Sequence, residues 1–74
     1  MRAIERTQVF NPERKEERVV IIATTTPATL PTTGVNVDNM PDDAYVSCGS
    51  VLLALDTSKK YVANEAGTFV EWAG

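Results

Sequence analysis

Residues 51–72 read VLLALDTSKKYVANEAGTFVEW, in which β-prone runs alternate with turn residues. The runs at 51–55, 60–63 and 68–72 contain Val, Leu, Tyr, Phe and Trp, residue types that favour strands. DTSK and NEAG stand between the runs. Their Asp can bond backbone N–H groups two residues on, and their Gly can adopt a positive φ. Short strands joined by loops of about four residues are typical of an antiparallel β-meander, so we predict an all-β fold built around it.

The meander is expected to be apolar on both faces. Side chains alternate along a strand, so Leu52 points away from Val51 and Leu53. In the last run Phe69 opposes Val70. A half-solvated antiparallel sheet has one polar face instead, so both faces of this meander need a cover.

Two covers for the second face remain open: the N-terminal segment folded over it, or identical chains packed against it. The chain has 74 residues, one Cys and no His, so it lacks an intrachain disulfide and the usual structural zinc sets. Domains of this size usually gain stability from such a staple or from a partner subunit. We therefore expect oligomerisation, with a candidate interface formed by Leu52, Ala54, Val70 and Trp72.

The N-terminal segment, residues 1–18, contains five cations and four acids. Asn11-Pro12-Glu13 is typical of a helix start, with Asn as the N-cap and Pro at the first helical position. The alternative is a hairpin whose return strand contains the β-prone run at 19–22. We expect the hairpin, and a charged arm that orders only on a partner is a third possibility.

Residues 19–43 continue from that strand into a connection rich in Thr and Pro. Pro27 and Pro31 remove backbone donors and push the residues before them into extended conformations, so a helix cannot form here. We expect an irregular connection over the surface. A short strand at 44–47 then begins the C-terminal unit, residues 44–74, which contains the meander.

The charged and reactive residues argue against several classes of function. The net charge of −3 is unfavourable for nucleic-acid binding, which needs a surplus of Lys and Arg. Without His, Cys48 has no partner for a thiolate–imidazolium pair, and we interpret it as a small buried or half-buried apolar residue. Asp42 and Asp43 are interpreted as solvated turn residues. We predict no catalytic, cofactor-binding or metal-binding residues, and therefore no enzyme.

A membrane span is also not expected. Residues 19–37 lack charge, but their purely apolar run covers only 19–23, whereas a spanning helix needs about 20 mostly apolar residues. Charges are spread through the N-terminus where a signal peptide would have an apolar region. We expect no membrane partner and synthesis in a cytoplasm.

A longer pattern runs through the C-terminal unit: a Gly-Ser pair, an apolar strand, an Asp-Thr-x-Lys turn, a Tyr-containing strand, a Gly turn and a closing strand with Trp. It resembles a short module of small tailed-phage structural proteins, including head-fibre proteins and some tail proteins. LPTTG at 30–34 is similar to the segment before that module, so the resemblance covers about residues 30–72. Ser58 departs from the pattern, because the family usually has Gly there, and a turn that needs a positive φ would be strained. The module residues here are Gly49, Ser50, Asp56, Thr57, Lys59, Tyr61, Gly67 and Trp72.

The resemblance implies a virion component without catalytic activity, made in the host cytoplasm and assembled onto the particle. Its partners would be further copies of itself, often in a trimer, and other virion proteins such as the major capsid protein. We therefore expect a capsid decoration or head-fibre protein. Two alternatives remain open: a tail or baseplate accessory domain, and a small adaptor that binds a partner by strand addition at an open sheet edge.

Overall fold

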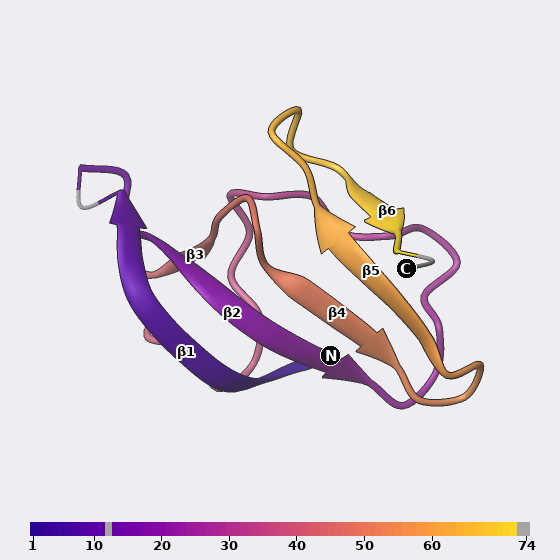
Figure 1. Ribbon diagram of the computed structural model, residues 1–74. Helices are drawn as coiled ribbons and strands as arrows, with labels where there is room; N and C mark the ends of the chain where they lie inside the picture. Colours follow the sequence, from indigo (N-terminus) through magenta and orange to yellow (C-terminus); the bar gives the residue numbers. More distant parts are fainter. Residues whose placement is uncertain (12, 73–74) are drawn as a thin grey trace.

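The computed structural model describes the backbone of residues 1–11 and 13–72, and the side chains of these residues except 7–11. The described residues form one mixed sheet of six strands (Figure 1). The strand order is β1-β2-β4-β5-β6, and β3 pairs with β2 beside this path. The described part of the chain contains no helix, which confirms the all-β prediction, and hence no helix that could span a membrane. The strands are β1 (Arg2–Asn11), β2 (Glu16–Ala23), β3 (Tyr45–Val46), β4 (Val51–Ala54), β5 (Lys59–Ala63) and β6 (Phe69–Glu71).

β1 and β2 form the predicted N-terminal hairpin. They pair antiparallel from Arg2 opposite Ile22 to Asn11 opposite Glu16, with residues 13–15 in the turn. Asn11 therefore belongs to a strand, and the helix start is wrong; Pro12 lies outside the described residues. The β-branched run at 19–22 offers β1 a complete partner strand, whereas an isolated helix of one or two turns is unstable in water.

The C-terminal meander has the predicted strands and connections. β4 pairs antiparallel with β5, and β5 pairs antiparallel with β6. The strand expected at 44–47 shortens to β3, two residues that pair in parallel with Glu16 and Glu17 of β2.

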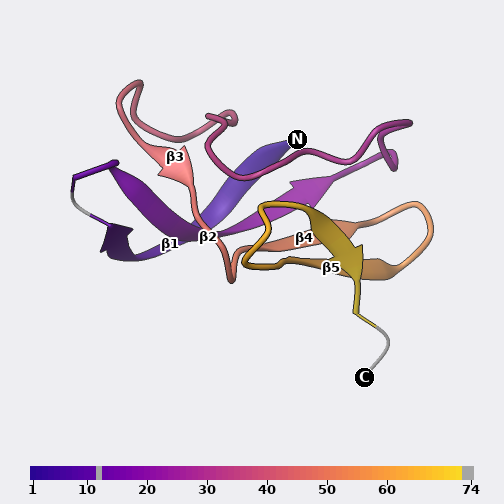
Figure 2. The same ribbon diagram turned by 90° about the horizontal axis from the view of Figure 1, so that it is seen from above.

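A parallel pair joins the hairpin to the meander. β2 lies beside β4, with Val20 opposite Val51 and Ala23 opposite Ala54. Parallel neighbours need a crossover connection, and residues 24–50 supply it. Figures 1 and 2 show that the hairpin extends the sheet sideways from β4, so the alternative in which it folds over a face of the meander is wrong. Edge pairing satisfies the backbone groups of β4 that would otherwise remain unpaired.

The crossover connection, residues 24–50, covers one face of the sheet and completes the core there (Figure 2). Val37, Met40 and Ala44 are buried with the central side chains Ile21 and Leu52. The connection is irregular, as predicted, but it contributes to the core as well as to the surface. The side-chain amide of Asn36 donates to the carbonyls of Pro41 (2.6 Å) and Ala44 (2.8 Å) and so holds part of this segment in shape.

Candidate interaction surface

The face of the sheet turned away from the crossover connection, here called the outer face, is not covered by any other segment among the described residues. Its side chains alternate with the buried ones along β2 and β4. The central side chains of the outer face are all apolar, and Val70 is 46% exposed while the others are half-buried. A contiguous apolar surface of this kind is typical of an interaction site. The central residues are Val20, Ile22, Val51, Leu53, Val62 and Val70.

Cross-strand register arranges these side chains in two rows, because residues directly opposite one another share a face of the sheet. The first, the valine row, crosses from β2 to β6 through Val20, Val51, Val62 and Val70. The second, the leucine row, runs through Ile22, Leu53 and Lys60. It ends at Trp72, whose backbone N–H donates to the Lys60 carbonyl at 2.7 Å.

The candidate interface predicted from sequence is divided between the two faces. Leu52 and Ala54 are 0% and 1% exposed and lie in the core, so they do not form an exposed interface in this structure. Val70 and Trp72 lie on the outer face, and Trp72 is 53% exposed. The crossover connection covers the Leu52 side of β4 and leaves the Val51 and Leu53 side open. Sequence reasoning missed these two residues as interface candidates, although alternation had already placed them on one shared face.

A charged side chain, Lys60, lies next to β6 at the end of the leucine row. The Lys60 Nζ lies 6.0 Å from the centre of the Trp72 ring, within reach of a cation–π interaction. The Lys60 stem is apolar, so this end of the row is amphipathic. Lys59 and Glu71 form an ion pair at 3.6 Å on the opposite, inner face, because they lie across from Ala54 and Tyr61.

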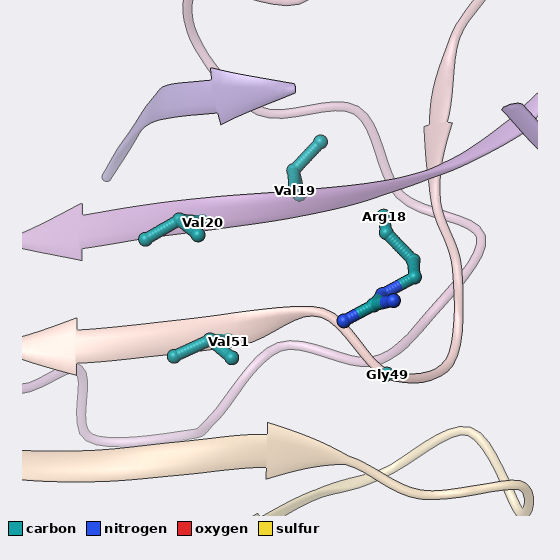
Figure 3. A pocket seen from close by; sticks show the side chains of 5 residues that line it. All are labelled: Arg18, Val19, Val20, Gly49 and Val51. Carbon is teal, nitrogen blue, oxygen red and sulfur yellow. The ribbon is translucent and has the colours of Figure 1, made fainter. Parts of the chain in front are cut away.

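A small hollow lies beside the valine row, between the start of β4 and the middle of β2 (Figure 3). Gly49 lies at its edge, with φ at +83° and its N–H donating to the Ala63 carbonyl at 2.8 Å. The Arg18 side chain passes close to it, because a Cβ built on Gly49 would lie 3.4 Å from the Arg18 Nε. The lining residues are Arg18, Val19, Val20, Gly49 and Val51.

The module residues do not gather into one site. Asp56 and Thr57 hold the start of the crossover connection, because Asp56 accepts hydrogen bonds from Thr26 Oγ1 (2.6 Å) and Thr26 N (3.0 Å). Thr57 Oγ1 lies 3.2 Å from Thr26 Oγ1. The Thr26 hydroxyl bond, with the backbone bond second, holds the pKa of the Asp56 carboxyl below its ordinary value. Tyr61 is buried in the core, beside Leu52 of the neighbouring strand.

Gly67 adopts the positive φ predicted for its turn, whereas the contacts of Ser50 with β2 and of Gly67 with Thr33 could not be predicted from the sequence. Ser50 is buried, and its Oγ accepts a hydrogen bond from Val19 N at 3.1 Å, which ties β2 to the start of β4. Gly67 has φ at +90°, and a Cβ there would come within 2.9 Å of Thr33 Oγ1. The Thr33 N–H also donates to the Gly67 carbonyl at 2.9 Å, so the connection is attached to the last turn.

On the inner face, the buried carboxylate of Glu17 forms an ion pair with the exposed Arg6. Arg6 donates from Nε to Glu17 Oε1 (2.8 Å) and from Nη2 to Glu17 Oε2 (2.7 Å). This two-point bond holds the pKa of the Glu17 carboxyl below its ordinary value. Asp43 is exposed in a turn, as predicted, and pairs with Lys15 at 3.3 Å.

The remaining titratable and thiol groups do not form a reactive cluster in the described part of the chain. Cys48 is a free, half-buried thiol, as predicted. Asp42, like Asp43, is an exposed turn residue. Among the described residues, no three Cys, Asp or Glu side chains are placed to hold a metal ion.

Comparison with known proteins gives no relative for this fold or this surface. No family model matches the sequence, and neither a curated protein nor a solved structure is significantly similar to it.

Proposed function

We propose that the chain is a non-enzymatic structural protein of a bacteriophage virion, a capsid decoration or head-fibre protein that binds the shell as an oligomer. The observation that carries this proposal is the uncovered apolar outer face. One of the two apolar faces of the sheet is thus left half-buried to exposed by the described residues of the chain. The resemblance of residues 30–72 to the phage module adds the class of particle.

Burial of the outer face would supply the stability that a small domain without a staple lacks. Each fully buried Val, Leu or Ile side chain contributes about 1.5–3 kcal/mol relative to an exposed one. The valine row alone crosses four strands. Most of these side chains are already half-buried in the single chain, so each gains only part of that amount, and several together contribute about a few kcal/mol, a sizeable share of the stability of a small domain.

Binding of a partner strand at a sheet edge is less well supported than packing of a partner on the outer face. β1 is an edge strand, but its register with β2 shifts at three places, and bulges are a common protection of sheet edges. Its start is already occupied, since the Ala3 N–H donates to the Asp38 carbonyl and the Asn39 amide donates to the Ala3 carbonyl. At the other edge β6 has only three residues.

The direct test starts from cultures of cells whose own genome or resident phage encodes this chain. Phage particles are purified from these cultures, and the amount of the protein in them is measured by quantitative mass spectrometry. We expect the protein in the particles at many copies, in a fixed ratio to the major capsid protein. Immunogold labelling should place it on the head. Label on the tail would support a tail or baseplate domain instead, and absence from purified particles together with abundance in the cytosol would refute the proposal.

A pair of variants links incorporation to the outer face. Leu53→Asp places a charge in the middle of the leucine row and should strongly reduce the copy number on particles. Ala28→Asp places the same charge at an exposed site on the crossover connection and should leave the copy number unchanged. Equal incorporation of the two variants would show that the outer face is not used.

A further inference from the structure

The β1 rim of the outer face carries two opposite charges in a self-complementary arrangement, and Arg18 and Lys60 are further cations of this face that lie outside it. Beyond the apolar rows, β1 contributes Glu5 opposite Val20 and Arg2 opposite Ile22. These two side chains thus extend the valine row and the leucine row with opposite charges. Both are exposed, and neither forms an ion pair with another residue of the described chain. If a second copy is rotated by 180° and placed against this rim, the acid of each copy lies opposite the base of the other.

The same face has a projecting apolar side chain and a hollow at matching positions. Leu55 follows β4, and its N–H donates to the Ala23 carbonyl at 2.9 Å, so it continues the pairing of β4 with β2. By alternation it shares the face of Val51 and Leu53, and it is 53% exposed. At the opposite end of β4 lies the hollow between Arg18 and Gly49. On β4 the midpoint between the two rows is Leu52, and Leu55 and Gly49 each lie three residues from it.

We propose that the outer face binds the outer face of a second copy of this chain, about a two-fold axis that crosses the strands between the valine row and the leucine row. Such an axis runs across the strands, so each strand packs over its own copy, and β4, the middle strand of the order β1-β2-β4-β5-β6, lies at the centre of the pair. The valine row of each copy covers the leucine row of the other. This inference deepens the proposed function, because it names the occupant of the surface on which that proposal rests.

A two-fold interface is isologous, so every contact occurs twice. Glu5 of each copy faces Arg2 of the other, which gives two ion pairs at the β1 end. Leu55 of each copy enters the hollow beside Gly49 of the other. Packed sheets cross at about 30°, and the long Arg and Glu side chains can span the offset that this angle produces at the rim.

The size of the face fits such a pair. The molecule measures 34 × 23 × 20 Å, and Figure 1 shows the sheet across its broad side. The rectangle that encloses this side, 34 × 23 Å, has an area of about 780 Å², which is an upper bound on the footprint of the flat face. A standard interface takes about 800 Å² of accessible surface from each partner, so a stable pair would use most of this side.

The experiment is a charge exchange measured by sedimentation equilibrium of the purified full chain. The wild type should have twice the mass of the 8.1 kDa chain. Arg2→Glu and Glu5→Arg each place like charges opposite one another, and each should weaken the dimer at least tenfold. The double variant Arg2→Glu with Glu5→Arg should restore the wild-type affinity, because the two charges exchange places across the axis. Failure of the double variant to recover would overturn the proposed arrangement.

Leu53→Asp should give a folded monomer, and Ala28→Asp should remain dimeric. Circular dichroism of both variants checks that the sheet is intact. A wild-type chain that is monomeric at 100 μM, or that has the threefold mass expected from the phage resemblance, would refute the two-fold pair. Incorporation into particles that still depends on Leu53 would then leave the proposed function standing, so the two proposals fail separately.

Discussion

Ser58 has a φ of +56°, a left-handed backbone conformation that costs a residue with a Cβ about 1–2 kcal/mol. Ser58→Gly should remove this strain, although the greater freedom of Gly in the unfolded chain offsets about 0.5–1 kcal/mol of the gain. We expect a net stabilisation of about 0.5–1 kcal/mol, measured as a higher urea midpoint. Ser58→Ala keeps the strain and should give no such gain. A lower midpoint for Ser58→Gly would show that the hydroxyl stabilises the turn.

Glu17 makes a pH-dependent contribution to stability through its two bonds with Arg6. The pKa of its carboxyl is lowered in the folded chain, so this contribution is fully present above the ordinary Glu pKa of about 4.3 and is lost as the pH falls through the lower folded value. Glu17→Gln should therefore destabilise the chain at pH 7, by less than the about 1.5–3 kcal/mol typical of a bond to a charged group, because Arg6 is 41% exposed and water screens the pair.

Urea titrations at several pH values test the Glu17 prediction. The difference in unfolding free energy between wild type and Glu17→Gln should be constant from pH 7 to about 5 and should shrink in stronger acid. Glu65→Gln, at an exposed site in the turn between β5 and β6, serves as the control and should follow the wild-type curve. A difference that stays constant down to pH 2 would contradict the assigned role of the carboxylate.

At the scale of elements, the β4–β5 turn is attached to the crossover connection by the bonds between Thr26 and Asp56. Thr26→Val removes the hydroxyl bond, the largest cause of the lowered Asp56 pKa, and keeps the backbone bond. The pKa of Asp56 should therefore rise toward its ordinary value, as measured by NMR titration of the side-chain carboxyl. Thr25→Val, at the exposed neighbouring site, should leave it unchanged. An unaltered Asp56 pKa in Thr26→Val would show that the two segments are not held together in this way.

Local signals were sufficient to predict the strands but insufficient to predict how they join. The hairpin and the meander each pair neighbours along the chain, so β-prone runs and turn residues predict both. The parallel pairing of β2 with β4 depends on a crossover of 27 residues, 24–50, and nothing in the local pattern specifies it. Val37 and Met40 are buried in a segment without strand or helix periodicity, so their place in the core could not be predicted either.

At the scale of the whole molecule, the sequence shows that the sheet has two apolar faces but not which one its own chain covers. Leu52 and Leu53 are adjacent and chemically identical, yet one is fully buried and the other lies on the outer face. The difference comes from the side on which the crossover connection passes, a property of the topology and not of either residue. The candidate surface therefore followed from the fold, while its apolar character was already evident from the alternation.

The two faces should respond differently to truncation of an aromatic side chain. Phe69 is 4% exposed and Trp72 is 53% exposed, although they are three residues apart. Phe69→Ala should cost about 3–5 kcal/mol at every protein concentration, because it opens a cavity in the core. Trp72→Ala should change the thermal midpoint little in a dilute sample, where the outer face is uncovered.

The dependence of the thermal midpoint on protein concentration shows whether the outer face is covered by other copies of the chain. If copies associate through this face, the thermal midpoint of the wild type rises with concentration, because assembly stabilises only the folded chain. Trp72→Ala should then reduce that rise while leaving the dilute midpoint in place, whereas Phe69→Ala should lower the whole curve. Differential scanning calorimetry across a hundredfold range of concentration measures both effects. A wild-type midpoint that does not depend on concentration would mean that the outer face remains open to solvent in isolation and that any cover for it comes from a different protein.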